Sequence, residues 1–189
     1  MIDTMPMTHA DLASLDLMFL QELISPEVSA QLPSGVSKTQ MRPLVSTDYK
    51  RRHLDVLSVL SIVNDLCEVL AWVSQFHAMR ATPNAYFSVI ILDKASDKIV
   101  GVGTVFIERK FLRGLGRVGH IEDIAVDRSQ QGKKLGLRII QAPTHISESG
   151  GCYKIILNCN DTNIPFYRKC GYVKKEKEMM NLSIFYSFY

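Results

Sequence analysis

The sequence has no long hydrophobic run and no strong excess of one charge. Its longest unbroken aliphatic run is Val89–Leu92, far short of the roughly 20 residues of a membrane-spanning helix, so a membrane span is excluded. Lys and Arg number 22 against 19 Asp and Glu, which gives a net charge of +3. Because nucleic-acid-binding domains are usually more basic than this, nucleic acid is not expected as a partner.

Signals for secretion and for metal binding are also lacking. The first residues carry acids where a secretion signal would carry Lys or Arg. The four cysteines form no CxxC pair, and the five histidines form no HExxH or HxxxH pattern. We therefore expect a cytoplasmic protein with reduced thiols and without a metal.

The residues that are present suffice for a well-packed domain. The chain has 189 residues, of which 47% are hydrophobic and 22% are charged. A chain of this size can bury a core without disulfides or metals, and its composition excludes disorder. The fold proper is predicted over residues 41–189. Residues 1–40 are interpreted as an N-terminal extension, with an amphipathic helix over Asp11–Leu23 and a loop over residues 25–38.

Hydrophobic periodicity in the rest of the chain predicts a mixed α/β protein. Strands are expected at Met41–Ser46, Tyr86–Leu92, Lys98–Phe111, Val118–Asp127 and Tyr153–Cys159, and again from Tyr172. Helices are expected over residues 48–64 behind an N-cap at Ser46-Thr47-Asp48, and over Leu66–Ala81, Gly132–Ser149 and Asn163–Cys170. Hairpins in the middle and a late β-α-β crossover predict a mixed sheet with helices on both faces.

One connection is suited to binding phosphate. A strand that ends at Asp127 is followed by a short polar loop, which brings Gln131, Gly132 and Lys133 to the start of a helix. Backbone N–H groups at a helix start lack intrahelical partners and attract anions, and glycine lets the backbone approach a ligand closely. The Walker pattern GxxxxGK[ST] is absent. On these residues alone, an ordinary strand–loop–helix connection with solvated lysines is an equal alternative.

The same loop resembles the acetyl-CoA motif of the GNAT superfamily of N-acetyltransferases. That motif is Gln/Arg-x-x-Gly-x-Gly/Ala, and here it reads Gln131–Gly136, with Lys134 in the place of the first glycine. Further segments follow the order and spacing of one GNAT family, the eukaryotic glucosamine 6-phosphate N-acetyltransferases: IERKF (107–111), GHIEDIAV (119–126), GCYKIILNC (151–159) and N-x-x-FY-x-x-CGY (163–172). The resemblance covers about residues 40–182.

The resemblance implies a GNAT fold, in which a twisted mixed sheet is flanked by helices and its central strands splay apart. Acetyl-CoA is then expected in the split, with its pantetheine arm paired like an added strand to the main chain of Ile124, Ala125 and Val126. Its pyrophosphate is expected on Gln131, Gly132, Lys133, Lys134, Leu135, Gly136 and Leu137. Other family positions beside the cofactor fall on Asn158, Asn163, Phe166, Tyr167 and Arg168.

The implied reaction is acetyl transfer to the amine of glucosamine 6-phosphate, which gives N-acetylglucosamine 6-phosphate for UDP-N-acetylglucosamine synthesis. It needs a base for the amine proton and a donor for the leaving thiolate. Glu122 and Asp123 are the candidate catalytic carboxylates. Because neighbours in a strand point to opposite faces, both serve one site only if the strand is bulged or split; the alternative is a strand edge facing water. Tyr167 is the candidate proton donor, and its alternative is a core tyrosine packed beside Phe166.

Family positions that contact the acceptor fall on Ser46, Lys110, Phe111, Leu112, Arg113, Glu122, Asp123, Ile124, Pro143 and Thr144. The cations of Lys110 and Arg113 suit a sugar phosphate, although a solvated basic loop would look the same. Two positions depart from the family. Asn158 stands where relatives carry Asp or Glu, and Leu182 stands where they carry an Arg that helps to hold the phosphate.

Three hypotheses about function follow. The first is a glucosamine 6-phosphate N-acetyltransferase. The second is a GNAT enzyme that acetylates another amine, which Asn158, Leu182 and Pro143 favour. The third is a non-catalytic module that binds acetyl-CoA or dimerises, against which the Gln131–Gly136 loop and Tyr167 argue. The resemblance also implies a homodimer.

Overall fold

The structure is a computed structural model that describes residues 15–30, 39–63 and 69–175 of the chain. The chain divides into two compact units, Met1–Asn158 and Cys159–Tyr189. Each unit is described by itself below.

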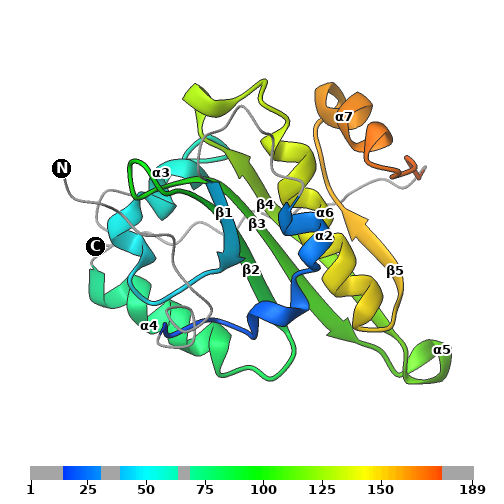
Figure 1. The fold of residues 1–189 in the computed structure, drawn as a ribbon. Helices are drawn as coiled ribbons and strands as arrows, with labels where there is room; N and C mark the ends of the chain where they lie inside the picture. The colour runs from blue at the N-terminus through cyan, green and yellow to red at the C-terminus, as the bar shows by residue number, and fades with distance from the viewer. Residues whose placement is uncertain (1–14, 31–38, 64–68, 176–189) are drawn as a thin grey trace, which may run out of the picture. The chain divides into compact units, whose positions relative to one another are not determined.

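The first unit is built on a five-stranded sheet in the order β1-β2-β3-β4-β5 (Figure 1). The strands are β1 (Thr39–Pro43), β2 (Tyr86–Asp93), β3 (Lys98–Arg109), β4 (Arg117–Val126) and β5 (Cys152–Leu157). Neighbours from β1 to β4 are antiparallel, whereas β5 runs parallel to β4. The predicted mixed sheet is therefore confirmed. Pro43, which has no N–H to donate, lies in the edge strand β1, where proline is tolerated.

Helices cover both faces of this sheet. On one face, α6 (Leu135–Ser149) comes so close that a Cβ on Gly119 would lie 2.5 Å from Ser147 Oγ. On the opposite face, α3 (His53–Leu57) and α4 (Val69–Arg80) close a hydrophobic core. That core joins strand residues to helix residues, among them Ile90, Val102, Ala125, Val56, Trp72 and Phe76. Alternate residues of β4 thus belong to different layers of the molecule.

A buried ion pair fixes the turn after β1. Arg42 donates from Nη1 and Nη2 to the two carboxylate oxygens of Asp48 at 2.7 and 2.8 Å. The side chains are 2% and 0% exposed. Asp48 also accepts the N–H of Val45 at 2.9 Å. This bidentate geometry offsets the cost of removing both charges from water.

The expected helix over Asp11–Leu23 is wrong for its described part. Leu17 forms a β-bridge with Val45, and only Gln21–Leu23 adopts a helical turn, the 3-10 turn η1. The N–H of Met18 donates to the carbonyl of Leu44 at 2.8 Å, and the Met18 side chain joins the core. A tertiary contact thereby overrides the helical periodicity of this segment. The domain boundary at residue 41 stays a prediction.

The loop expected from residue 25 is also wrong at its start, where α2 (Pro26–Ala30) forms. Proline suits the first position of a helix, and the Ser25 hydroxyl accepts the N–H of Glu27 at 3.2 Å in the manner of an N-cap. Residues 31–38 lie outside the described residues.

The long helix expected over residues 48–64 is broken. A 3-10 turn, η2 (Asp48–Arg51), and α3 are separated by Arg52, whose φ is 67°. Thr47 is the N-cap residue of η2 and makes no capping side-chain bond, and the Asp48 carboxylate is bonded to Arg42. The N-cap expected at Ser46-Thr47-Asp48 is therefore wrong. The helix expected over Leu66–Ala81 is confirmed over Val69–Arg80 as α4, while residues 64–68 lie outside the described residues. The helix expected over Gly132–Ser149 is confirmed as α6 from Leu135 onward.

The second unit contains the 3-10 turn η4 (Asp161–Asn163) and α7 (Ile164–Lys169). Gly171, with φ of 90°, follows α7 and donates its N–H to the carbonyl of Arg168 at 3.0 Å. This is the geometry in which a glycine ends a helix. The strand expected from Tyr172 is wrong over residues 172–175, which have no regular secondary structure; its remainder, with Leu182, lies outside the described residues.

Candidate active site

The centre of β4 carries a β-bulge. Thr104 of β3 pairs with Glu122 and Val102 pairs with Ala125, so Gly103 alone faces both Asp123 and Ile124. Asp123 takes a φ of 56°, in the left-handed region. Both Glu122 and Asp123 are exposed. The bulge that these adjacent acids required is therefore confirmed, and it lets neighbouring carboxylates reach the surface together.

Gly103 makes room for this bulge. A Cβ at Gly103 would come within 2.9 Å of Ile124 Cδ1 and 3.1 Å of Ile139 Cγ1. Any side chain would therefore press on the bulge and on α6 together. Glycine at this position lets the helix pack directly beneath the two carboxylates.

Beyond the bulge, β4 parts from β5. The parallel ladder between them ends at Ile121 and Leu157, whereas β4 stays paired to β3 as far as Val126. From Glu122 to Val126, the edge of β4 that faces β5 is therefore not paired with a neighbouring strand. This confirms the predicted splaying, and an extended ligand can pair with such an edge through main-chain groups. Asn158, which directly follows β5, is exposed.

The loop after β4 has defined internal bonds. Asp127 accepts the N–H and the hydroxyl of Ser129 at 2.9 and 2.5 Å. The Gln131 amide donates to the carbonyl of Val126 at 3.4 Å, which ties the loop back to the strand. Gly132 then adopts a φ of 81° with open space where a Cβ would lie. This freedom is the property expected of a phosphate loop glycine.

The first turn of α6 follows this loop directly. Lys134 occupies the N-cap position with φ 61° and makes no capping side-chain bond. The N–H groups that open the helix are thus not satisfied by a cap, and the helix dipole makes this end attractive to anions. Lys133 and Lys134 are both exposed, and Lys133 donates to the Gln130 side chain at 2.7 Å.

Electrostatics make the two carboxylates of the bulge more basic than usual. Although both side chains are exposed, partial loss of hydration beside the surrounding protein atoms and the negative charge of Asp123 raise the pKa of Glu122, whereas the charge of His120 lowers it. Partial loss of hydration likewise raises the pKa of Asp123. A carboxylate with a raised pKa is a better proton acceptor near neutral pH.

A second group of charged residues consists of Glu108, Lys110 and His120, of which only Lys110 was singled out from the sequence. Glu108 on β3 bonds to Lys110 and also to His120 Nε2 on β4, the latter at 2.9 Å. The hydrogen bonds from Lys110 and His120 lower the pKa of Glu108. Glu108 and His120 are 12 residues apart in the sequence, on two strands of a hairpin. Only knowledge of the strand register could have paired them.

The segment Lys110–Arg113, which is predicted to contact the acceptor sugar, lies in the turn between β3 and β4. Phe111 and Leu112 are 96% and 73% exposed. Residues Leu112–Leu115, labelled α5 in Figure 1, include Arg113 in the left-handed region at φ 58°. The Arg113 guanidinium lies 5.9 Å from the centre of the Tyr153 ring, in cation–π range. The proposed phosphate contacts of Lys110 and Arg113 remain predictions, and both cations have partners within the chain.

The other predicted acceptor residues lie on different elements. Ser46 lies in the turn after β1, with β2 and β3 between that strand and β4. Pro143 is buried within α6, and Thr144 donates to the Ile140 carbonyl at 2.8 Å. The helix continues through Pro143 to Ser149. Substrate roles for these three side chains stay predictions.

The predicted residues of the second unit lie together around α7. Asn163 is its N-cap residue and makes no capping side-chain bond. The Tyr167 ring contacts the rings of Phe166 and Tyr172, at 5.1 and 6.2 Å between centroids. Arg168 is exposed. The cofactor and proton-donor roles of these residues stay predictions.

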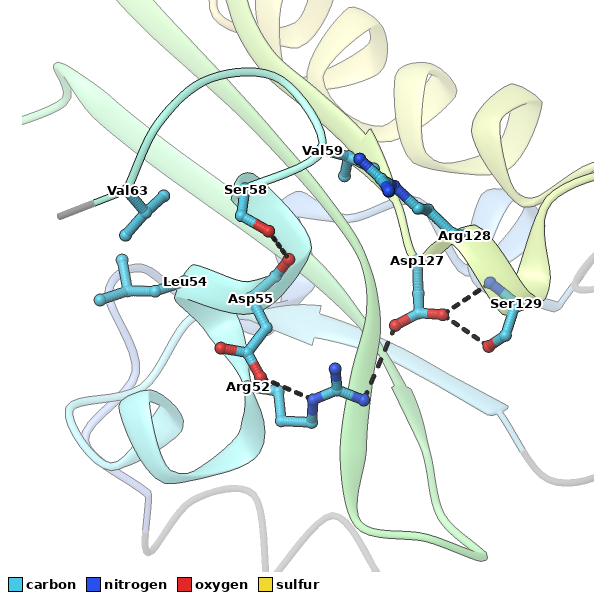
Figure 2. A pocket seen from close by; sticks show the side chains of 9 residues that line it. All are labelled: Arg52, Leu54, Asp55, Ser58, Val59, Val63, Asp127, Arg128 and Ser129. Carbon is cyan, nitrogen blue, oxygen red and sulfur yellow. Dashed lines mark hydrogen bonds and ion pairs between the residues drawn. The ribbon is translucent and has the colours of Figure 1, made fainter. Parts of the chain in front are cut away.

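A hollow of about 610 Å³ opens beside the loop that follows β4 (Figure 2). Arg52 lies between two acids there, 2.7 Å from Asp55 and 3.9 Å from Asp127. Ser129 and Arg128 line the loop side, and the remaining lining comes from α3 and the residues after it, Leu54, Ser58, Val59 and Val63. Its charges balance within the hollow, so this geometry mainly ties the loop to α3. Sequence reasoning did not single out these residues.

No group of three or more His, Cys, Asp or Glu side chains in the described ranges is arranged to bind a metal. Among the same residues, no helix combines the length and apolar character that crossing a bilayer requires.

Comparison with known proteins decides the family. Residues 59–172 match the Acetyltransferase (GNAT) family. The chain belongs to the GNAT acetyltransferases. Among GNAT relatives, glucosamine 6-phosphate N-acetyltransferase 1 of Dictyostelium discoideum is 36% identical over 152 residues, covering 80% of this chain and 94% of the relative. The glucosamine 6-phosphate N-acetyltransferase of Candida albicans is 37% identical over 149 residues, covering 79% and 97%.

Solved GNAT structures agree with this assignment. The crystal structure of glucosamine-6-phosphate N-acetyltransferase from Arabidopsis thaliana has a TM-score of 0.74 and 33% identity, and it covers 77% of this chain and 99% of that one. A predicted acetyltransferase from Clostridium acetobutylicum, solved with acetyl-CoA, has a TM-score of 0.58 and 15% identity, and covers 77% and 96%. The second likeness concerns the fold alone. The GNAT fold expected from the sequence is confirmed.

Proposed function

We propose that this GNAT protein transfers the acetyl group of acetyl-CoA to the amine of glucosamine 6-phosphate, giving N-acetylglucosamine 6-phosphate for UDP-N-acetylglucosamine synthesis. One observation carries the proposal. The open edge of β4 leads from two exposed carboxylates at the bulge to the uncapped start of α6. Acetyl-CoA is an extended acetyl donor with phosphates at one end and a thioester at the other. It can therefore lie along this edge, with its phosphates at the start of α6 and its thioester near the two carboxylates.

The chain offers main-chain binding for acetyl-CoA. Ile124 and Val126 lie on the unfilled edge of β4, where their backbone groups can pair with the amides of a pantetheine arm. The N–H groups of Gly132–Gly136 and the charges of Lys133 and Lys134 then bind the pyrophosphate. Acetyl-CoA supplies the thioester, and the protein supplies orientation and charge. Asn158, Asn163, Phe166 and Arg168 remain proposed contacts of the same ligand.

Glu122 and Asp123 are proposed to hold the sugar and accept the proton of its amine. A sugar ammonium ion has no lone pair, so it must lose a proton before it attacks the thioester carbonyl. The N–C bond then forms and the C–S bond breaks, with the sulfur leaving as a thiolate. The nitrogen gives up a second proton as the amide forms, which balances the proton that the thiolate takes up. Because partial loss of hydration raises the pKa of both carboxyls, they suit the first proton transfer. Tyr167 is proposed to protonate the thiolate.

A second candidate is a GNAT enzyme with another amine as acceptor. Asn158 favours it, because an amide cannot act as a base at a position that the resemblance assigns to a carboxylate. Ser46, Lys110, Arg113, Pro143 and Thr144 would then bind a different acceptor. The relatives at 36% and 37% identity are glucosamine 6-phosphate N-acetyltransferases, which favours the sugar phosphate.

We further propose a cytoplasmic homodimer. The β3–β4 turn supports a second copy as partner, because Phe111, Leu112 and Leu115 are 96%, 73% and 72% exposed, and exposed apolar clusters of this kind mark interaction surfaces. The free thiols of Cys152, Cys159 and Cys170 suit a reducing compartment.

The proposal is tested by following CoA release with acetyl-CoA and a panel of amines. Glucosamine 6-phosphate should be the best acceptor, ahead of glucosamine, because the proposed site binds a phosphate. Glu122→Gln and Asp123→Asn should each lower kcat by roughly 10²-fold or more, the usual contribution of a general base. Turnover that is faster with an unphosphorylated amine would select the second candidate instead.

A further inference from the structure

The strand register gathers a polar cluster on one face of the sheet, next to the bulge. Tyr86 of β2, Phe106 of β3 and His120 of β4 lie side by side across three strands. Their rings contact in sequence, at 5.1 Å for Tyr86 and Phe106 and 5.8 Å for Phe106 and His120. The imidazole thus packs against the Phe106 ring in a tilted arrangement, with 49° between the ring planes. The face is the one opposite α6, since Gly119 and Ile121 alternate with His120 along β4.

The next row of the same face contains Glu122. Ser88, Thr104 and Glu122 are register partners across the same three strands, and the Ser88 and Thr104 hydroxyls are 2.8 Å apart. His120 and Glu122 are two residues apart in β4 before the bulge, so their side chains leave the strand on the same side. The imidazole is therefore a neighbour of the proposed catalytic carboxylate.

Glu108 fixes the tautomer of this imidazole. A carboxylate only accepts hydrogen bonds, so His120 Nε2, at 2.9 Å from Glu108 Oε2, carries a hydrogen. In the neutral ring the remaining nitrogen, Nδ1, then has the lone pair. The arrangement is that of a carboxylate that orients a histidine to accept a proton.

We propose that His120, oriented by Glu108, acts through Glu122 as a positioning residue that takes over the proton removed from the acceptor amine. This rests on the proposed acetyl transfer. The net reaction converts an ammonium ion and a thioester into an amide, a thiol and one proton. Glu122 first takes the amine proton; its O–H bond then breaks as an N–H bond forms at His120 Nδ1, directly or through one water. The imidazolium, stabilised by the Glu108 carboxylate, returns the proton to solvent, which resets Glu122 as a base.

The groups around His120 support this direction of transfer. Glu108 faces it from β3, with Lys110 bonded to the same carboxylate. Glu122 is the acid on its own strand, and the register partner from β5 is the uncharged Ile156. Once it holds the proton, His120 also favours the ionised form of Glu122. His120 is 28% exposed, so solvent can receive the proton.

The experiment compares wild type with His120→Ala, Glu108→Gln and, as a matched control, His77→Gln at an exposed histidine of α4. Steady-state CoA release is measured across pH with and without added imidazole. His120→Ala should lower kcat at least about tenfold, less than the full 10²–10⁴-fold of a direct acid or base, with KM for acetyl-CoA unchanged. Imidazole should restore its turnover in proportion to concentration but leave wild type and His77→Gln unaffected. Glu108→Gln should move the acidic limb of the rate profile to lower pH, because the imidazolium loses its carboxylate partner.

Two results would overturn the inference while the proposed function stands. One is a wild-type enzyme that acetylates glucosamine 6-phosphate while folded His120→Ala turns over equally fast. The other is a slow His120→Ala that imidazole does not rescue, together with an unshifted profile in Glu108→Gln, which would make the pair merely structural. If His120→Ala fails to fold, the Glu108→Gln profile decides alone. A wild type without turnover on any amine would instead refute the proposed function.

Discussion

Lys134 is the residue whose replacement tests the phosphate loop most sharply. It occupies the first glycine position of the GNAT motif, and it adopts φ 61° and ψ 14° at the N-cap of α6. Two positions of this loop have a left-handed backbone: Lys134 and Gly132, the latter with φ 81°. Glycine adopts this region freely, whereas lysine crowds its Cβ against the backbone. We therefore predict that Lys134→Gly stabilises the protein.

The magnitude follows from two opposing effects. A non-glycine residue in the left-handed region costs about 1–2 kcal/mol. Glycine loses more backbone entropy on folding, which costs about 0.5–1 kcal/mol. The net gain in the free energy of unfolding should therefore be about 0.5–1 kcal/mol, or about 1–4 °C in Tm for a protein of this size. Lys134→Ala should show no such gain, because alanine retains the Cβ.

Gly132 provides the reciprocal test. A Cβ there would meet nothing within 4 Å, so Gly132→Ala changes the backbone preference and little else. It should lower the free energy of unfolding by about 1 kcal/mol. Urea unfolding of the four proteins without ligand measures these differences, and calorimetry with acetyl-CoA shows whether Lys134→Gly and Lys134→Ala differ in affinity. Equal stabilities for Lys134→Gly and Lys134→Ala would refute the assignment of backbone strain to this position.

Two further predictions concern buried polar groups. Arg42→Met leaves the Asp48 carboxylate, 0% exposed, without its bidentate partner, and should lower the free energy of unfolding by about 3–5 kcal/mol in urea titrations. Arg42→Met combined with Asp48→Leu should lower it by less than the sum of the two single changes. Strictly additive losses would contradict the coupling between the two residues. Burial lowers the pKa of His53 from 6.5 to about 4, and its Nδ1 accepts the Trp72 indole N–H at 3.2 Å. The neutral ring therefore contributes stability that is complete above about pH 6.5 and is lost as the pH falls through about 4, by up to about 1.4 kcal/mol per pH unit. Urea titrations of wild type and His53→Gln over this range should diverge, and parallel curves would show that His53 is not buried in the neutral form.

The hydrophobic periodicity of the sequence predicted most helices and strands of the first unit, because the side chains that are buried there are those that the periodicity places on the inner faces. The central strands alternate between the α6 face and the opposite face, and the Glu122-Asp123 pair is understandable only with a bulge, which the structure contains. Segments decided by tertiary contacts were not predictable in this way. Met18 bonds to Leu44 in place of a helical partner, and Arg52 interrupts the helix expected after residue 48.

The site was predictable where chemistry is local in sequence. The loop Gln131–Gly136 is continuous, so the phosphate-binding role proposed for it could be inferred from residue order. The Glu108–His120 pair and the Arg52–Asp127 contact join residues far apart in the chain, and only strand register and helix placement bring them together. Within the second unit, the Tyr167 ring contacts the rings of Phe166 and Tyr172, and its role as a proton donor stays a prediction.

The central claim is that the open edge of β4, with its carboxylates and the start of α6, performs acetyl transfer to a sugar phosphate amine. The most direct measurement is mass spectrometry of the products after the purified chain is incubated with acetyl-CoA and glucosamine 6-phosphate. The account predicts a sugar phosphate heavier by one acetyl group, formed in equal amount to free CoA and greatly reduced by Glu122→Gln. Release of CoA without an acetylated sugar, or an unchanged yield in Glu122→Gln, would contradict it.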